Sequence, residues 1–361
     1  MTMQMKRIAA LLLCAALTLC LLPQQARAAE EAPGNTATSA LVADAYTGKV
    51  IYEKNADEER AIASVTKIMT GYLACEGLAL NDEKLDERFT VSKHAAESDK
   101  DGTSLYLLPD QEVTYEELLY GTMLRSGNDA AVALAEAVSG SEDAFLERMN
   151  EKAAELGMEH SHFSSVNGLV DEDNYSTARD LAVLARAAME NELFAKVVGT
   201  WYIELGPFKI ENHNQLLSDM KGECLGIKTG FTTLAGQTLV TCAQRDGSRF
   251  IVVTLNDNYQ FDTHKRLYEW AFANYPANAL CTEGQSVTTL RIGDMEVPLI
   301  AGKTLLASSV DKTAAVECTI RLPARISGAI AQGAVAGTVT YTLDGEELGT
   351  VELTYSSFVV N

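Results

Sequence analysis

The spacing of hydrophobic residues changes once along this chain, at about Pro276, and this change most limits what the chain can fold into. Before Pro276, strand-like runs lie near both ends of a long segment, and apolar residues between them recur at helical spacing. The clearest of these runs span residues 39–45, 50–52, 237–243 and 249–255. Strands at both ends with helices between them predict a sheet packed by helices, and therefore an α+β fold.

After Pro276 the chain contains only short β-rich runs, separated by turn residues such as Asp344-Gly345. The runs span residues 286–292, 296–300, 316–322, 338–343 and 349–355. A chain of 361 residues is also long for a single domain. We therefore predict an α+β domain over residues 29–275, followed by a small all-β domain over residues 276–361.

The first 28 residues have the pattern of an export signal. Lys6 and Arg7 precede an apolar run over residues 8–22, and alanines flank Arg27 at the expected cleavage site. The run is shorter than the ~20 residues needed to span a bilayer. We predict a cleaved signal peptide over residues 1–28, with a retained anchor as the alternative. The mature protein is then expected outside the cytoplasmic membrane, as a secreted or cell-envelope protein.

The composition excludes some classes of partner. The chain has 29 Lys and Arg against 50 Asp and Glu, a net charge of −21, and loss of Lys6, Arg7 and Arg27 with the leader would make it −24. Such an acidic chain is a poor candidate for binding nucleic acid, and no nucleic-acid partner is expected. No spacing of Cys, His or acidic residues predicts a metal site, and no cofactor is expected.

The first motif with chemical meaning is Ser64-Val65-Thr66-Lys67, at the start of a predicted helix. Residues i and i+3 share one face of a helix, so Ser64 and Lys67 would touch. A serine hydroxyl is a poor nucleophile near neutral pH, and a lysine can act as its base if burial or a second cation lowers the lysine pKa. Alone the motif is weak, because a solvated Ser and Lys on a helix often have this spacing.

A second motif, Ser126-Gly127-Asn128, follows a predicted helix that opens with Thr114 and Glu117 in capping-box spacing. Ser126 could relay a proton between the nucleophile, Lys67 and a leaving amine. Asn128 could hydrogen-bond an amide of a peptide substrate and hold Lys67 in place. By itself Ser-Gly-Asn is most often a turn.

The third motif, Lys228-Thr229-Gly230, precedes a predicted strand. Lys228 could lower the pKa of Lys67 and attract a substrate carboxylate, which the Thr229 hydroxyl would share. Gly230 would let a substrate backbone lie against an edge strand. The backbone N–H groups of Ser64 and Phe231 would form an oxyanion hole. Three such motifs in this order are typical of serine acyl transfer in class A β-lactamases and penicillin-binding proteins.

With these motifs the chain resembles the serine-type D-alanyl-D-alanine carboxypeptidases, the low-molecular-weight penicillin-binding proteins of peptidase family S11. The likeness covers most of residues 39–361 and is closest at residues 63–70, 125–131 and 226–232. It implies a β-lactamase/transpeptidase-like catalytic domain, followed by the family's β-rich second domain. It also implies removal of the terminal D-Ala from peptidoglycan stem peptides through a Ser64 acyl-enzyme, with β-lactam antibiotics as covalent inhibitors.

Some features depart from the family pattern. Phe231 stands where better-known members carry His, which keeps the backbone N–H and changes the side-chain contacts. Residues 165–169 replace an Asn-Pro-x-Gly-Leu pattern, so this loop is expected to differ. The chain stops at Asn361 directly after a β pattern, and no C-terminal membrane anchor is evident.

Two other functions share the motif set. A class A-like β-lactamase would deacylate through a Glu in an E-x-x-L-N pattern, which is missing after the second motif. A penicillin-sensing binding module would stay acylated, and transpeptidation also stays open. The predicted site comprises three catalytic residues (Ser64, Lys67 and Ser126) and five substrate-binding residues (Asn128, Lys228, Thr229, Gly230 and Phe231).

Overall fold

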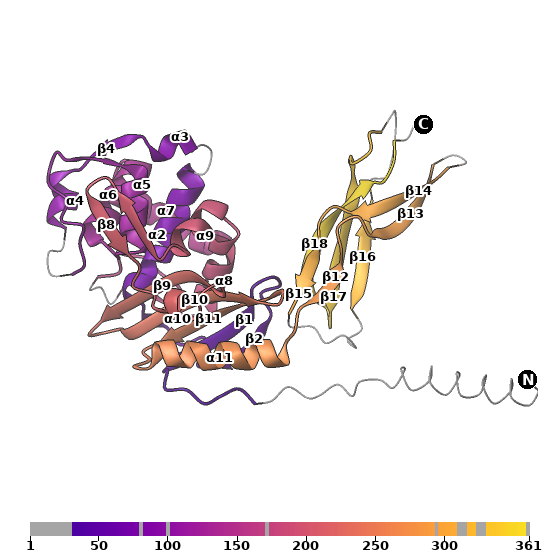
Figure 1. The fold of residues 1–361 in the computed structure, drawn as a ribbon, viewed down its shortest axis with the longest axis horizontal. Helices are drawn as coiled ribbons and strands as arrows, with labels where there is room; N and C mark the ends of the chain where they lie inside the picture. The colour runs from indigo at the N-terminus through magenta and orange to yellow at the C-terminus, as the bar shows by residue number, and fades with distance from the viewer. Residues whose placement is uncertain are drawn as a thin grey trace, which may run out of the picture.

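The structure is a computed structural model that describes residues 31–78, 82–98, 102–169, 173–292, 295–308, 316–322 and 330–358. The predicted leader over residues 1–28 lies outside these ranges. The first part of the chain forms a helical region and a sheet, and the last part forms a separate all-β body (Figure 1). The predicted α+β fold is confirmed. In the described part of the chain, no helix combines the length and the apolar character needed to cross a membrane.

A five-stranded antiparallel sheet organises the first part of the chain, in the order β2-β1-β11-β10-β9. Its strands are β1 (Ser39–Asp44), β2 (Val50–Lys54), β9 (Cys224–Thr232), β10 (Gly236–Arg245) and β11 (Ser248–Leu255). The strand β1 therefore pairs with the last strand of the sheet along the chain, and β9 lies at an edge. An edge strand keeps backbone groups available on its outer side.

Side chains alternate between the two faces of this sheet, and helices cover both faces. On one face Val42, Leu239 and Phe250 pack with Leu267 and Tyr268 of α11 (Gln260–Asn274). On the other face, alternate residues of the same strands join the large core cluster with α2 (Lys67–Leu78) and α8 (Ala178–Met189). The sheet is thus the middle of three layers.

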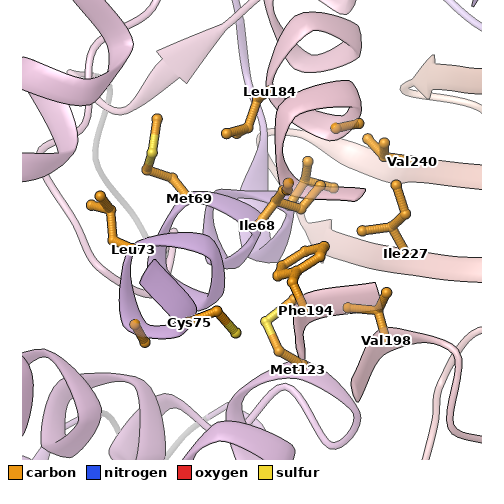
Figure 2. Close-up of a cluster of buried hydrophobic side chains, with 14 of the residues drawn as sticks. Ile68, Met69, Leu73, Cys75, Met123, Leu184, Phe194, Val198, Ile227 and Val240 are labelled. Carbon is orange, nitrogen blue, oxygen red and sulfur yellow. The ribbon is translucent and has the colours of Figure 1, made fainter. Parts of the chain in front are cut away.

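The helix α2 runs through the middle of the large core cluster (Figure 2). Ile68, Met69 and Leu73 of α2 are buried, and Ile227 from β9 and Phe194 from α9 belong to the same cluster. The surrounding helices are α5 (Tyr115–Met123), α6 (Asn128–Ser139), α7 (Glu142–Glu155) and α9 (Glu192–Val198). The predicted capping box is present at the start of α5, where Thr114 and Glu117 each bond the backbone of the other.

Short elements connect these helices and strands. Three two-stranded ribbons are β3 (Arg60–Ala61) with β6 (Tyr175–Ser176), β4 (Arg88–Thr90) with β5 (Glu112–Thr114), and β7 (Tyr202–Leu205) with β8 (Phe208–Glu211). The short helices are η1 (Ala63–Thr66), α3 (Asp82–Leu85), α4 (Lys93–Glu97) and α10 (Leu216–Asp219).

After α11 the chain enters an all-β region with its own hydrophobic core. Five strands form one sheet in the order β13 (Ser286–Ile292), β14 (Met295–Ala301), β18 (Glu346–Tyr355), β17 (Val335–Leu343) and β16 (Glu317–Arg321). A small ribbon pairs β12 (Asn278–Cys281) with β15 (Leu305–Ala307). Ser308, directly after β15, connects this region to the first sheet: its N–H donates to Asp44 Oδ2 (2.8 Å), and its Oγ accepts from the N–H of Arg249 (3.2 Å).

Candidate active site

A cleft of about 660 Å³ lies between the helical region and the edge strand β9. The predicted residues Ser64, Ser126, Thr229, Gly230 and Phe231 line this cleft. The predicted residues Asn128 and Lys67 lie behind it, in contact with each other (Nζ to Oδ1, 2.8 Å). The fold therefore brings together three motifs that are far apart in the sequence.

Ser64 lies in the 3-10 turn η1, which leads directly into α2. The preceding Ala63 has a left-handed backbone (φ 50°), which is unusual for a residue with a Cβ. Two glycines enclose this turn: a Cβ on Gly230 would lie 3.0 Å from Val65 N, and one on Gly168 would lie 2.5 Å from the carbonyl carbon of Ala63. The turn that presents Ser64 is thus fixed by close backbone contacts on two sides.

Lys67 is fully buried at the start of α2. Its Nζ lies 3.1 Å from Ser64 Oγ, and it donates to Asn128 Oδ1 (2.8 Å) and to the backbone carbonyl of Asn167 (2.7 Å). The predicted contact between Ser64 and Lys67 is therefore present. The contact with Asn167 was not predicted, because a backbone carbonyl leaves no signal in the sequence.

The loop that includes Asn167 is bound closely to η1 and α2. Thr70 Oγ1 donates to the Val166 carbonyl (2.6 Å), and Asn174 Nδ2 donates to Thr66 Oγ1 (2.8 Å). Gly168, with φ +77°, allows the loop to pass directly against the Ser64 turn. The loop predicted to differ from the family pattern thus contributes directly to positioning Lys67.

Ser126 lies in the short connection between α5 and α6. Its backbone is left-handed (φ 64°) and its side chain is buried. Its Oγ has no hydrogen-bond partner among the described residues. Backbone strain and an unpaired buried hydroxyl often mark functional positions, because a bound group can complete the hydrogen bonding.

Asn128 and Asp129 open α6 and fix the opposite wall of the cleft. The backbone N–H of Asn128 donates to the Thr103 carbonyl (2.8 Å). The Asp129 carboxylate accepts from Ser104 Oγ and from the backbone N–H groups of Leu105 and Leu107. This carboxylate therefore holds the segment after Gly102 and Thr103, which line the cleft.

The residues of the third motif alternate along β9. Lys228 is buried, Thr229 faces the cleft and the side chain of Phe231 is 61% exposed. Lys228 Nζ donates to the Thr229 carbonyl (3.0 Å), and burial lowers the pKa of Lys228 to about 7. Gly230 has a structural role that the sequence did not reveal, since its close approach to η1 leaves no room for a side chain.

His213 also lines the cleft and was not predicted as a site residue. Burial lowers the pKa of His213 to about 4, and positive charge on Lys228, Arg125 and Lys67 adds to this effect. The imidazole is therefore neutral near pH 7. The site combines a serine hydroxyl with two buried lysines, which suits acyl transfer from a substrate with a negative charge.

Comparisons with known proteins agree with this reading. The family model described as D-alanyl-D-alanine carboxypeptidase, peptidase S11, matches residues 26–259. The D-alanyl-D-alanine carboxypeptidase DacF of Bacillus subtilis is 33% identical, with 86% of this chain and 83% of that protein covered. The D-alanyl-D-alanine carboxypeptidase DacC of Escherichia coli is 32% identical, with 88% of this chain and 83% of that protein covered.

Solved structures share the fold over nearly the whole chain. Penicillin-binding protein 5 from Haemophilus influenzae superposes with a TM-score of 0.72 at 29% identity, covering 92% of this chain and 100% of that chain. PBP3 from Streptococcus pneumoniae has a TM-score of 0.76 at 24% identity, covering 91% of this chain, and supports the fold alone. The chain therefore belongs to peptidase family S11, the D-alanyl-D-alanine carboxypeptidases among the low-molecular-weight penicillin-binding proteins.

Proposed function

We propose that Ser64 is the nucleophile of this carboxypeptidase and that Lys67 is its base. The observation that carries the proposal is the set of contacts around Lys67 Nζ. They include two carbonyl oxygens, of Asn128 and Asn167, and the Ser64 hydroxyl. An uncharged amine has two N–H donors and one lone pair. With its donors on the two carbonyls, its lone pair can accept the proton of Ser64.

The reaction then proceeds in two stages. Ser64 Oγ attacks the carbonyl carbon between the last two residues of the peptide, and its proton moves to Lys67 Nζ. The C–N bond breaks, the terminal residue leaves as an amine, and a proton reaches that amine through Ser126. Water attacks the resulting ester, which releases the shortened peptide and restores the Ser64 hydroxyl.

Backbone groups stabilise the oxyanion in this scheme. Ser64 lies in the first turn before α2, and Phe231 lies on the neighbouring edge strand, so their N–H groups are candidates for the oxyanion hole. Asn128 would hydrogen-bond the substrate amide in addition to holding Lys67. Gly230, which has no side chain, would allow β9 to pack directly against the Ser64 turn.

Lys228 and Thr229 would bind the free carboxylate of the substrate. Without substrate, Lys228 has a pKa of about 7 because it is buried, so near pH 7 some of the molecules carry a neutral Lys228. A bound substrate carboxylate would favour the charged form of the Lys228 amine, and the two opposite charges would then neutralise each other. The preferred substrate is accordingly a peptide that ends in D-Ala-D-Ala, as in stem peptides of peptidoglycan, and β-lactams would acylate Ser64 as substrate mimics.

The test uses two substrates of the same site. Intact mass should show one covalent adduct after incubation with benzylpenicillin, and free D-Ala should appear from a diacyl-lysyl-D-Ala-D-Ala peptide. Ser64→Ala should abolish both results. A full adduct on Ser64→Ala would refute the assignment of the nucleophile. An adduct without any D-Ala release would favour the penicillin-sensing alternative.

We also propose that the mature chain acts outside the cytoplasmic membrane. The support is the export pattern over residues 1–28 and a substrate class found in the cell wall. Expression with export should give a mature protein whose N-terminus lies near Ala29. An N-terminus that retains residues 1–28 would contradict cleavage.

A further inference from the structure

A second groove of about 440 Å³ lies beside the active cleft. It is lined by Glu59, Arg60, Ala61, Tyr175 and Leu234. The same two chain segments border both cavities. One runs from Ala61 in the groove to Ser64 in the cleft, and the other from Thr233 in the cleft to Leu234 in the groove.

The proposed function fixes the direction in which a substrate crosses this surface. If Lys228 and Thr229 hold the terminal carboxylate, the peptide passes Ser64 opposite Gly230, and its earlier residues continue toward Thr232. β9 ends at Thr232 and Leu234 lies in the turn that follows, so at about 3.3–3.6 Å per residue Leu234 lies at most roughly 10 Å beyond Phe231. A long side chain on the residue before the cleaved dipeptide can cover that distance.

The groove offers charges of both signs. The side chain of Glu59 is 50% exposed and contacts His160 Nδ1 (3.2 Å). The side chain of Arg60 is 20% exposed and donates to Glu58 Oε1 (2.6 Å), while its Nε has no hydrogen-bond partner among the described residues. Tyr175 and Leu234 supply apolar contact for the aliphatic part of a side chain.

We propose that this groove binds the side chain of the residue that precedes the terminal D-Ala-D-Ala, and that it favours a side chain ending in both an ammonium and a carboxylate. Glu59 pairs with the ammonium, and Arg60 pairs with the carboxylate. The inference rests on the proposed function, because the direction of the peptide follows from carboxylate binding at Lys228. It adds a specificity site that is separate from the reacting groups.

The test compares three acylated X-D-Ala-D-Ala peptides. The side chain of X ends in a neutral acetyl-lysyl group, in a lysyl ammonium, or in the ammonium and carboxylate of a diaminopimelyl residue. For the unmodified enzyme, kcat/KM should rise in that order by about two- to fivefold at each step, the range of partly exposed charge pairs. Each variant is judged by the ratios to its own rate on the neutral peptide, which corrects for general loss of activity.

Glu59→Gln should remove the advantage of the ammonium, and Arg60→Gln should remove the further advantage of the carboxylate. Glu159→Gln is the matched control, since Glu159 is exposed beside His160 and does not line the groove. It should leave all ratios unchanged. Equal rates on the three peptides, or unchanged ratios in both groove variants, would overturn the inference. Failure to hydrolyse even the neutral peptide would instead refute the proposed function.

Discussion

Replacing Gly168 by Ala is expected to disable the enzyme without touching any reacting group. Gly168 has φ +77°, a conformation that costs a residue with a Cβ about 1–2 kcal/mol. The new Cβ would also lie 2.5 Å from the Ala63 carbonyl carbon and 2.7 Å from Thr66 Oγ1. Ordinary carbon contacts begin near 3.5 Å, and the Ala63 carbonyl oxygen is closer still to the new Cβ, so the loop and the Ser64 turn must separate by at least roughly 1 Å.

A separation of that size would displace both proposed reacting groups, Ser64 and Lys67. Asn167, the neighbour of Gly168, accepts the 2.7 Å hydrogen bond from Lys67, and Ala63 precedes Ser64. A misplacement of about 1 Å can cost on the order of 100-fold in rate. We therefore expect Gly168→Ala to slow both acylation by benzylpenicillin and release of D-Ala by about that factor. The assays are time-resolved mass spectrometry and a D-Ala determination.

Gly157→Ala is the matched control for backbone strain. Gly157 has nearly the same φ, +74°, and nothing lies within 4 Å of a Cβ placed there. This variant should lose about 1–2 kcal/mol in urea unfolding and keep its acylation rate. If Gly168→Ala retains activity within threefold of the Gly157→Ala variant, the close contact with the Ser64 turn does not position the site, and the reasoning is wrong.

Three further predictions follow from contacts in and around the cleft. The preference for a substrate with a free terminal carboxylate over its amide should fall as pH rises through about 7, because Lys228 loses its charge there. Lys228→Arg should flatten this pH dependence, and a variant with the same pH profile as the unmodified enzyme would contradict the role of Lys228. Asp129→Asn should reduce the free energy of unfolding by about 1–3 kcal/mol and raise KM, since the Asp129 carboxylate holds the segment next to Thr103. Unfolding curves measure the first effect and steady-state kinetics the second. We propose that residues 276–361 are a separable domain, so a chain ending at Tyr275 should keep D-Ala release. It should lose roughly 1–3 kcal/mol of stability, because the hydrogen bond between Ser308 and Asp44 is lost. A truncated chain that folds but is inactive would show that the second domain completes the site.

Some parts of the site follow from local rules that a sequence displays. Residues three apart share a helix face, so the contact of Ser64 with Lys67 was predictable. The capping box at Thr114 also depends only on neighbouring residues. The short β runs after Pro276 predicted the strands of the second sheet, because their period of two is visible without knowing their partners.

Other parts depend on the tertiary fold and were not predictable in this way. The hydrogen bond to Lys67 from the loop after Val166 uses a backbone carbonyl, which any residue carries. His213 enters the cleft because a loop after β8 passes there, and no residue pattern marks that passage. The elements α3, β4 and α4 were also not predicted, because elements of three to five residues are too short to show a period in the sequence.

The pairing of β1 with β11 has a consequence for the order in which the enzyme is made. Ser39 lies opposite Leu255 in the sheet, so the central strand β11 is among the last parts of this region to be synthesised. Contacts between residues so far apart require closure of a long chain segment and slow folding. The turn that carries Ser64 is complete only when Gly230 has packed against it. A chain released before β9 therefore contains Ser64 in its sequence but cannot complete the packing around the turn that carries it.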